Sequence, residues 1–264
     1  MGARLVARPD SIELGSGTRI PILYEDRSVL AVDKPAGWLL APSHWRQTRR
    51  NLQAELEAEI EAGAFWARAR NVKFLRFVHR LDAETSGVLL LARSRGAVAP
   101  LSALFEQRAV TKRYLAVVRG VPPRPHWRCR APIAPDPATP GLMRVDRRHG
   151  KEAETSFAVL ASRRHPDWGE VSLIEAQPLT GRTPQIRVHL LEGGHPVVGD
   201  WAYGGRFRPP TAARRKTEPP ALALRAFGLA YTDPFTRQRV RIQAPCDEFL
   251  QAWGFSPRSV AVAD

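Results

Sequence analysis

Short apolar runs along the chain predict a series of β-strands. The run at residues 88–92 is continuously apolar, which is typical of a strand covered on both faces. Further runs that predict strands lie at residues 22–24, 29–32, 110–118, 154–160, 171–176, 221–231 and 240–242. Close spacing between several runs favours hairpins, whereas helical stretches between others favour crossovers. We therefore expect an α+β fold with a large mixed, mostly antiparallel sheet flanked by helices.

Apolar residues at helical spacing predict two helices between these strands. In residues 51–61 they recur every four positions among glutamates, with Asn51 expected as the N-cap and Gly63 as the end signal. A second helix is expected at about residues 96–108. The side chains that it is expected to bury are Val98, Leu101, Leu104 and Phe105.

Proline-rich segments mark the expected surface loops. They lie at residues 121–125, 131–141 and 209–220, and the last also carries a basic run, Arg214-Arg215-Lys216. None of these segments indicates a domain boundary. We therefore expect a single catalytic domain over residues 1–264, with its core at about residues 20–250 and a C-terminal tail at residues 255–264.

The charge balance points to a polyanionic partner. The 264 residues include 40 lysines and arginines against 26 acidic residues, which gives a net charge of +14 and a pI of about 11.0. Nucleic acid is the leading candidate, with a solvated basic surface as the plainer alternative. The hydrophobic content of 44% is enough for a buried core and excludes a disordered or fibrous chain.

Cysteine usage and hydropathy exclude several other classes. The two cysteines, Cys129 and Cys246, have neither CxxC spacing nor a nearby histidine set, so neither a zinc site nor a disulfide framework is expected. No stretch approaches the roughly 18 apolar residues that a membrane-spanning helix needs. We expect a cytoplasmic protein with no metal site and no membrane partner.

An aspartate follows a basic dipeptide shortly before the apolar run. Residues 78–93 read VHRLDAETSGVLLLAR, so Asp82 lies in the loop just before the strand. An aspartate in this position could simply cap the following turn, which is a common role for this residue. It could equally be a catalytic group at the end of a core strand, and its neighbours alone favour neither interpretation.

This segment resembles the H-R-L-D-x-x-T-S-G catalytic motif of the RluA family of RNA pseudouridine synthases, which implies that Asp82 is the catalytic residue. Residues 33–37 (DKPAG) resemble the family's first motif, and residues 112–120 resemble its K-x-Y-x-A-x-V-x-G motif. Tyr114 in the latter is then expected to stack on the target uracil and to relay a proton, whereas on its own it would be taken for a core tyrosine. The small RNA-binding domain that many relatives carry before the first motif is expected to be absent.

A further block, TGRTPQIRVHL at residues 180–190, has the pattern of a short helix. Thr183 is expected to be the N-cap, Pro184 the first helical residue and Gly193 the end signal. By itself this pattern would make Arg187 a solvated residue on the helix surface.

The same block resembles the family's T-G-R-x-H-Q-I-R motif, and residues 193–200 resemble its G-H-P-I-x-G-D segment. The resemblance implies that Arg187 pairs with Asp82. A guanidinium within about 4–6 Å would keep the carboxylate ionised and fix its direction. Arg80 and Arg182 are expected to bind RNA, and Arg80 is placed to fill the stack that a flipped uridine leaves; its alternatives are a phosphate contact or a simple surface charge.

Two positions depart from the family pattern. Pro184 and Arg225 stand where relatives commonly carry histidine. These departures motivate an alternative function, a catalytically silent RNA-binding or chaperone module that retains the fold. A nucleotide hydrolase would instead need a phosphate-binding loop or a metal-ligand cluster, and the sequence indicates neither.

The expected function is the isomerisation of a specific uridine to pseudouridine in structured RNA, either ribosomal or transfer RNA. The N1–C1′ bond is broken and the base is rejoined through C5, so no metal or cofactor is required. Asp82 could attack the ribose, attack the pyrimidine ring or remove the ribose 2′ proton. The target nucleotide must first be flipped out of its helix, at a cost of about a few kcal/mol. We expect the protein to act as a monomer.

Overall fold

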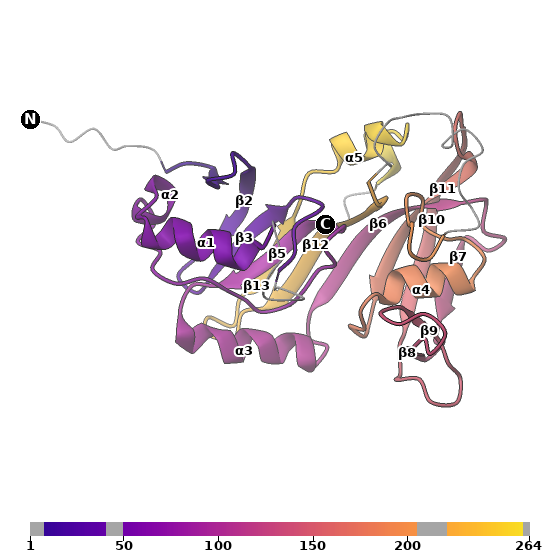
Figure 1. Ribbon diagram of the computed structural model, residues 1–264, viewed down its shortest axis with the longest axis horizontal. Helices are drawn as coiled ribbons and strands as arrows, with labels where there is room; N and C mark the ends of the chain where they lie inside the picture. Colours follow the sequence, from indigo (N-terminus) through magenta and orange to yellow (C-terminus); the bar gives the residue numbers. More distant parts are fainter. Residues whose placement is uncertain (1–7, 41–49, 205–220, 261–264) are drawn as a thin grey trace, which may run out of the picture. The chain divides into compact units, whose positions relative to one another are not determined.

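The computed structural model describes residues 8–40, 50–204 and 221–260, and the chain forms two compact units (Figure 1). Unit 1 comprises Met1–Ala109 and Tyr231–Ile242, and unit 2 comprises Val110–Ala230 and Gln243–Asp264. The expected basic loop at residues 209–220 lies outside the described residues. The single domain over residues 1–264 stays a prediction.

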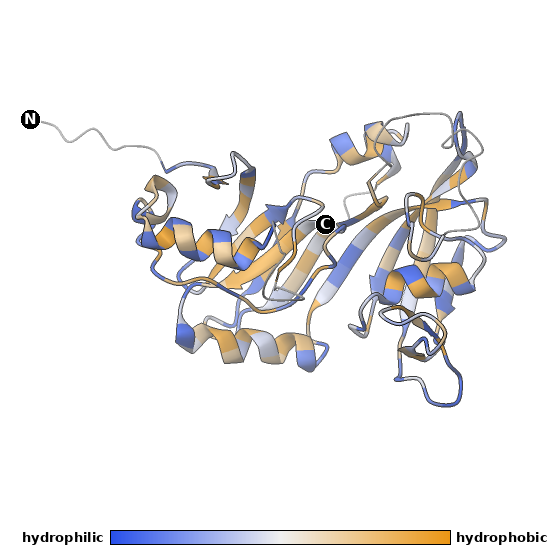
Figure 2. Ribbon diagram, in the orientation of Figure 1, coloured by the Kyte–Doolittle hydropathy of each residue, from blue (hydrophilic) through white to orange (hydrophobic). Residues whose placement is uncertain are grey.

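Unit 1 contains an antiparallel sheet with the strand order β1-β2-β3-β5. Its strands are β1 (Ser11–Glu13), β2 (Arg19–Glu25), β3 (Val29–Lys34) and β5 (Ser86–Ala92), and the short β4 (Arg76–Phe77) also pairs with β5. Every residue of β5 after Ser86 is buried, and Figure 2 shows this strand as hydrophobic. Because side chains alternate between the two faces of a sheet, both faces of β5 are covered, as the continuous apolar run predicted.

The first predicted helix is present as α1 (Leu52–Glu61), followed by the short α2 (Phe65–Arg68). The Asn51 side chain accepts a hydrogen bond from the backbone N–H of Ala54, at 3.3 Å, which confirms the expected N-cap. Gly63 follows the helix with a φ of 66°, in the left-handed region that glycine adopts readily.

The second predicted helix is α3 (Arg95–Glu106). Of the four side chains expected to be buried, only Leu101 is, together with Ala97. Val98, Leu104 and Phe105 are half-buried. The helix therefore buries one narrow row of side chains at i, i+4 spacing, narrower than the pattern of apolar residues predicted.

Unit 2 contains an antiparallel sheet with the strand order β12-β6-β11-β10-β7. Its strands are β6 (Thr111–Arg119), β7 (His126–Cys129), β10 (Thr155–His165), β11 (Gly169–Pro178) and β12 (Leu224–Thr232), whose last two residues belong to unit 1. Strands β8 (Ile133–Pro135) and β9 (Met143–Val145) form a separate hairpin. Its remaining elements are α4 (Gln185–Glu192), α5 (Asp247–Ala252) and the 3₁₀ turn η2 (Pro257–Ser259). Strand β13 (Arg239–Gln243) lies in unit 1 except for its last residue.

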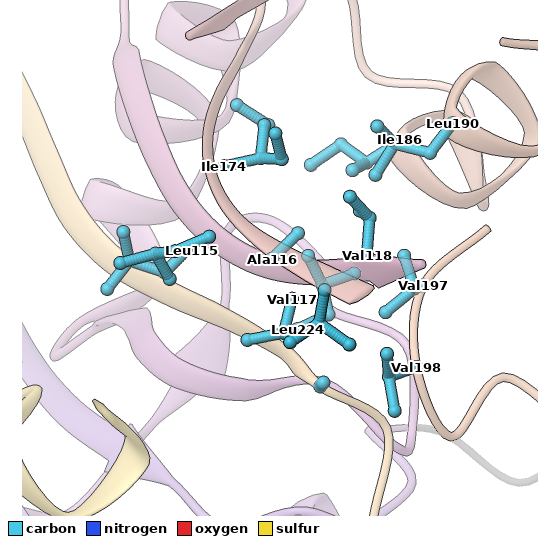
Figure 3. Packing of buried hydrophobic residues seen from close by; sticks show 14 of the residues in the cluster. Leu115, Ala116, Val117, Val118, Ile174, Ile186, Leu190, Val197, Val198 and Leu224 are labelled. Atoms are coloured by element: carbon cyan, nitrogen blue, oxygen red, sulfur yellow. The ribbon is translucent and has the colours of Figure 1, made fainter. Parts of the chain in front are cut away.

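The core of unit 2 is built around the apolar second half of β6. Figure 3 shows residues 115–118 of this strand packed against side chains of β11, β12 and α4. Ile186 and Leu190 of α4 belong to this cluster, one helical turn apart. The helix is therefore fixed to the sheet by its apolar face, and its other residues are held in a defined orientation.

The α+β class and the mostly antiparallel pairing are confirmed. The predicted loop at residues 131–141 is partly wrong, because it contains strand β8, which pairs with β9 from Ile133 to Pro135. Only one residue of this strand is buried, so its hydropathy carries no strand signal. Proline is tolerated there because the strand is short and lies at an edge.

Across residues 8–40, 50–204 and 221–260, no helix combines the length and the apolar character needed to cross a membrane. The same residues hold no group of three or more His, Cys, Asp or Glu side chains arranged to bind a metal ion.

Candidate active site

Asp82 lies in a tight turn that leads directly into β5. The backbone N–H of Thr85 donates to the main-chain carbonyl of Asp82, at 3.1 Å, so closure of this turn does not depend on the carboxylate. Asp82 is half-buried and Thr85 is buried. Gly87, the second residue of the strand, has a φ of 115°, a conformation that residues with a Cβ rarely adopt. The loop therefore presents Asp82 from a defined backbone.

Lys34, at the end of β3, holds this loop from within the unit. Its side chain is fully buried, and Nζ donates to the carbonyl oxygens of Pro35, Ala83 and Thr85 at 3.0, 2.7 and 2.9 Å. Three acceptors match the three protons of an ammonium group. Two of the carbonyls flank Glu84, so Lys34 fixes the backbone immediately after Asp82. This role of Lys34 was not predicted, and the available signal was a lysine at the end of a largely apolar strand.

Burial lowers the pKa of Lys34 to about 8, while the carboxylates of Glu84 and Asp82 oppose this shift. A lysine in the unfolded chain titrates near pH 10.4, so between about pH 8 and 10 the unfolded chain binds one more proton. The free-energy penalty of burying the charged ammonium group is fully present below pH 8, and it decreases as the pH rises from about 8 to 10. We expect the free energy of unfolding of the wild type to rise relative to that of Lys34→Met, by up to about 3 kcal/mol.

Urea denaturation of both proteins at pH 7 and pH 10 measures this difference. Lys73→Met, which replaces an exposed lysine of the same unit, is the control and should show no such trend. A wild-type-to-Lys34→Met difference that stays constant across the range would contradict the prediction.

His79 attaches the start of the motif to the same unit. The backbone N–H of Leu90 in β5 donates to Nε2 of His79 at 2.9 Å, so this nitrogen is an acceptor and carries no proton. The imidazole also stacks on Phe105 of α3, with ring centres 4.5 Å apart. The neighbouring Arg80 is exposed and forms no hydrogen bond or ion pair with any described residue. His79 is thus a structural residue, and Arg80 faces solvent.

Arg187 is held on α4 by two partners. It forms a bidentate ion pair with Asp200, with Nε–Oδ2 and Nη2–Oδ1 distances of 2.7 and 2.8 Å. The Asp200 side chain is completely buried, and its Oδ1 also accepts the backbone N–H groups of Ala202 and Tyr203. The guanidinium carbon lies 4.9 Å from the centre of the Tyr203 ring. Charge-assisted hydrogen bonds and a cation–π contact together fix the orientation of Arg187.

The expected pair between Arg187 and Asp82 joins residues of different units and stays a prediction. The roles of Asp200 and Tyr203 beside Arg187 were not predicted from the sequence. The sequence did hold a signal for Asp200, which closely follows the apolar pair Val197-Val198, because a carboxylate that becomes buried requires a cationic partner.

Tyr203 also connects α4 to the hairpin, because its hydroxyl accepts the backbone N–H of Met143 in β9, at 2.9 Å. We expect Tyr203→Phe to lower the free energy of unfolding by about 1 kcal/mol, since it removes this bond and keeps the ring. Tyr203→Leu should add roughly 0.5–1 kcal/mol through loss of the cation–π contact. Chemical denaturation of the two variants measures both steps. Equal stability of the Phe and Leu variants would contradict the assigned role of the ring.

A chain of buried hydrogen bonds fixes the start of α4. Thr180 donates to Oε1 of Gln185 at 2.6 Å, and Nε2 of Gln185 donates to the hydroxyl of Thr155 at 2.9 Å. Nε2 of His189 lies 2.9 Å from the carbonyl oxygen of Ala131, which can only accept, so Nε2 carries the proton. Nδ1 therefore accepts from Thr155, at 2.9 Å. Burial lowers the pKa of His189, which favours this neutral form.

The predicted cap of this helix is wrong. Helix α4 begins at Gln185 with Pro184 as the N-cap residue, and no side chain caps it, so Thr183 has no capping role. Instead Oε1 of Gln185 turns back and accepts the backbone N–H of Arg182, at 3.1 Å. This bond stabilises the turn before the helix in place of the expected cap.

The remaining candidate residues lie at defined positions in unit 2. Tyr114 on β6 is half-buried, and its register partners in the flanking strands are Ala176 and Ala226, whose small side chains leave the ring uncrowded on that face. Arg182 is exposed, and its Nε donates to the carbonyl of Glu152 at 3.1 Å. The roles expected for Tyr114 and Arg182 stay predictions.

Arg225 is only 9% exposed, and its Nε donates to the carbonyl of Pro245 at 2.9 Å. The arginine at this position thus ties β12 to the segment before α5, which is a structural contact within unit 2.

Comparisons with known proteins place these motifs in context. Residues 28–192 match a family model described as RNA pseudouridylate synthase. The chain is similar to "Ribosomal large subunit pseudouridine synthase C" from Vibrio vulnificus (strain CMCP6), with 34% identity over 87% of this chain and 67% of that protein. The protein of the same name from Escherichia coli (strain K12) is 35% identical, with the same shares covered.

Two solved human structures share the fold. "Human RNA Pseudouridylate Synthase Domain Containing 1" gives a TM-score of 0.65 and 29% identity over 86% of this chain and 84% of that one. "Human RNA Pseudouridylate Synthase Domain Containing 4" also gives a TM-score of 0.65, with 24% identity over 85% of this chain and 87% of that one.

Proposed function

The chain belongs to the RNA pseudouridylate synthase family, and from this premise we propose that Asp82 is the carboxylate with which it isomerises a specific uridine to pseudouridine in large-subunit ribosomal RNA. The isomerisation of uridine in RNA follows from the family and its relatives, and a catalytically silent module finds no support there. The observation that carries the assignment to Asp82 is the construction of its loop: a half-buried carboxylate on a backbone fixed by Lys34 and His79.

A rigid loop suits this reaction because a catalytic group acts efficiently only when it is held in place against the reacting atoms. In this proposal Asp82 acts either on the ribose or on the base of the flipped uridine. We assign Tyr114 to stacking against the detached uracil, because a phenol offers a flat apolar face and a polar tip. Arg80, which is exposed beside the loop, is proposed to fill the stack that the uridine leaves.

Arg187 is proposed to be the cationic partner of Asp82. Asp200 engages Nε and Nη2 of the guanidinium, and a guanidinium has five N–H donors, more than one carboxylate uses. Arg187 can therefore bridge the buried Asp200 and a second carboxylate. In this arrangement Asp200 holds Arg187 in position, and Arg187 keeps Asp82 ionised.

Ribosomal RNA is proposed as the substrate because the bacterial relatives are named "Ribosomal large subunit pseudouridine synthase C". Transfer RNA is the other candidate. The monomeric state and the cytoplasmic location expected from the sequence stay predictions. Arg182 is proposed to contact the RNA backbone, since its side chain is exposed at the start of the segment that carries Arg187.

Pseudouridine mapping tests this proposal. Total RNA from cells that lack the gene is incubated with the purified protein or with Asp82→Ala, and modified positions are mapped in both samples. We expect one or a few new sites in large-subunit ribosomal RNA with the wild type and none with the variant. Sites confined to transfer RNA would overturn the proposed substrate, and sites produced equally by Asp82→Ala would overturn the role of Asp82.

A further inference from the structure

Among the described residues of unit 2, the net positive charge is concentrated in residues 124–151, which we call the basic arm. The arm comprises β7, the hairpin β8–β9 and the turn that follows it, and it contains seven arginines and lysines against two aspartates. The rest of the described part of unit 2 contains nine basic and nine acidic residues. The net positive charge of this part of the molecule therefore belongs to one segment.

Strand β7 presents one side of the arm. It is the last strand of its sheet and pairs with β10. His126 and Arg128 alternate along it, Arg130 follows directly after its last residue, and all three are exposed. The intervening Trp127 faces the core, where it stacks on Phe157 with ring centres 4.9 Å apart. The strand thus fixes a row of basic side chains on its outer face at a spacing of about 6.8 Å.

The turn after β9 presents the other side. Oδ1 of Asp146 accepts the backbone N–H groups of Arg148 and His149 at 3.0 and 2.9 Å. A Cβ at Gly150 would lie 2.4 Å from the carbonyl oxygen of Asp146, so only glycine fits where the turn closes. Arg147, Arg148 and His149 are all exposed. The turn is therefore a defined structure that directs its basic side chains outward, and Figure 2 shows hydrophilic residues at this end of the hairpin.

Acidic side chains of the same unit neutralise only part of this charge. Arg128 and Arg130 share the single carboxylate of Glu154, at 3.0 and 3.2 Å, and Arg147 pairs with Glu192. Among the described residues Arg124, Arg148 and Lys151 form no ion pair. Their charge is available to an external anion.

The arm is seated on α4. Val188 of this helix packs with Ile133 and Ala153, and Met143 and Val145 of β9 pack against the same cluster. The bond between Met143 and Tyr203 adds a polar link. A ligand on the arm is therefore held in a fixed relation to the helix that carries Arg187.

We propose that the basic arm binds the phosphate backbone of the substrate RNA; this rests on the proposed function. Phosphates along an RNA strand form a linear series of negative charges, and a rigid row of exposed cations with few internal partners complements such a series. An acidic protein segment is the alternative occupant. RNA is favoured because the proposed function already requires the protein to bind it. Phosphate contacts position a nucleic acid without reading its sequence.

The test compares two double variants that each remove two exposed cations. Arg148→Ala/Lys151→Ala alters the arm, and Arg239→Ala/Arg241→Ala alters β13 in unit 1 and serves as the matched control. Neither pair forms an ion pair with a described residue, so folding should be preserved. Affinity for the RNA substrate is measured by fluorescence anisotropy at several salt concentrations, and the single-turnover rate is measured at saturating RNA.

We expect the arm variant to bind RNA on the order of tenfold more weakly and to reduce the slope of log affinity against log salt by about 2. The control should bind like the wild type, and the saturated rate of the arm variant should be unchanged. Wild-type affinity and salt slope in the arm variant would overturn the proposal and leave an acidic protein as the partner. An equal loss in the control would also overturn it. Failure of the proposed function is separate, because the wild type itself would then form no pseudouridine.

Discussion

Replacing Asp82 by asparagine is expected to lower the single-turnover rate of pseudouridine formation by at least about 10³-fold. Asparagine keeps the size and the polarity of the side chain but removes the negative charge. The loop should keep its shape, because its turn is closed by the main-chain carbonyl of Asp82 and its backbone is held by Lys34. A loss of rate can then be assigned to the missing charge.

Formation of pseudouridine in a defined substrate RNA, followed over time at saturating enzyme, measures this rate. RNA affinity and the free energy of unfolding, measured on the same preparation, are the controls and should stay close to the wild-type values. Glu84→Gln, which removes the next carboxylate of the same loop, is the matched variant and should retain activity. If Asp82→Asn keeps a rate within a few-fold of the wild type, Asp82 is not the catalytic group.

Arg187→Met is expected to reduce the free energy of unfolding by about 3–5 kcal/mol. The substitution keeps much of the side-chain volume but leaves the Asp200 carboxylate buried without its cation. The two backbone N–H groups that bind Oδ1 cannot replace a full positive charge. Catalysis should be lost as well, if Arg187 is the partner of Asp82.

A double-mutant cycle separates these two effects. Arg187→Met/Asp200→Asn removes the unpaired charge and keeps an acceptor for the backbone, so it should recover most of the lost stability. It should not recover activity. Arg182→Met, at an exposed arginine of the same segment, should change stability by less than about 1 kcal/mol. A single Arg187→Met variant as stable as the wild type would show that Asp200 does not depend on this pair.

Sequence patterns predicted the parts of the fold that depend on local order. The continuous apolar run before Arg93 became the buried β5, and Asn51 caps α1 because the cap contact spans only three residues. Strands β1, β4, β7, β8 and β9 were missed, since each has at most four residues. Such strands are defined by their partners, and a window of local sequence does not contain those partners.

In the candidate site, too, local motifs were predicted and long-range contacts were not. The motif located Asp82 and Arg187, but the contacts of Lys34 reach carbonyls 49 and 51 positions away, which no spacing rule reveals. The cap at the start of α4 was assigned to Thr183 because the local pattern fits. The assignment failed because the helix starts one residue later, at Gln185, whose backbone N–H donates to the carbonyl of Arg182. Long-range polar contacts therefore marked the limit of prediction.

Strand β5 holds the loop of Asp82 at two points. The loop runs into the strand at Ser86, and its beginning is tied to Leu90 through the imidazole of His79 and through the backbone N–H of Val78, which donates to the Leu90 carbonyl. The loop therefore cannot open without breaking contacts of the most deeply buried strand of unit 1. The hydrogen-bonded amide protons of Val78 and Thr85 should therefore exchange with solvent nearly as slowly as those of that strand. Entry of a bulky nucleotide would then depend on movement of the RNA and not on opening of this loop.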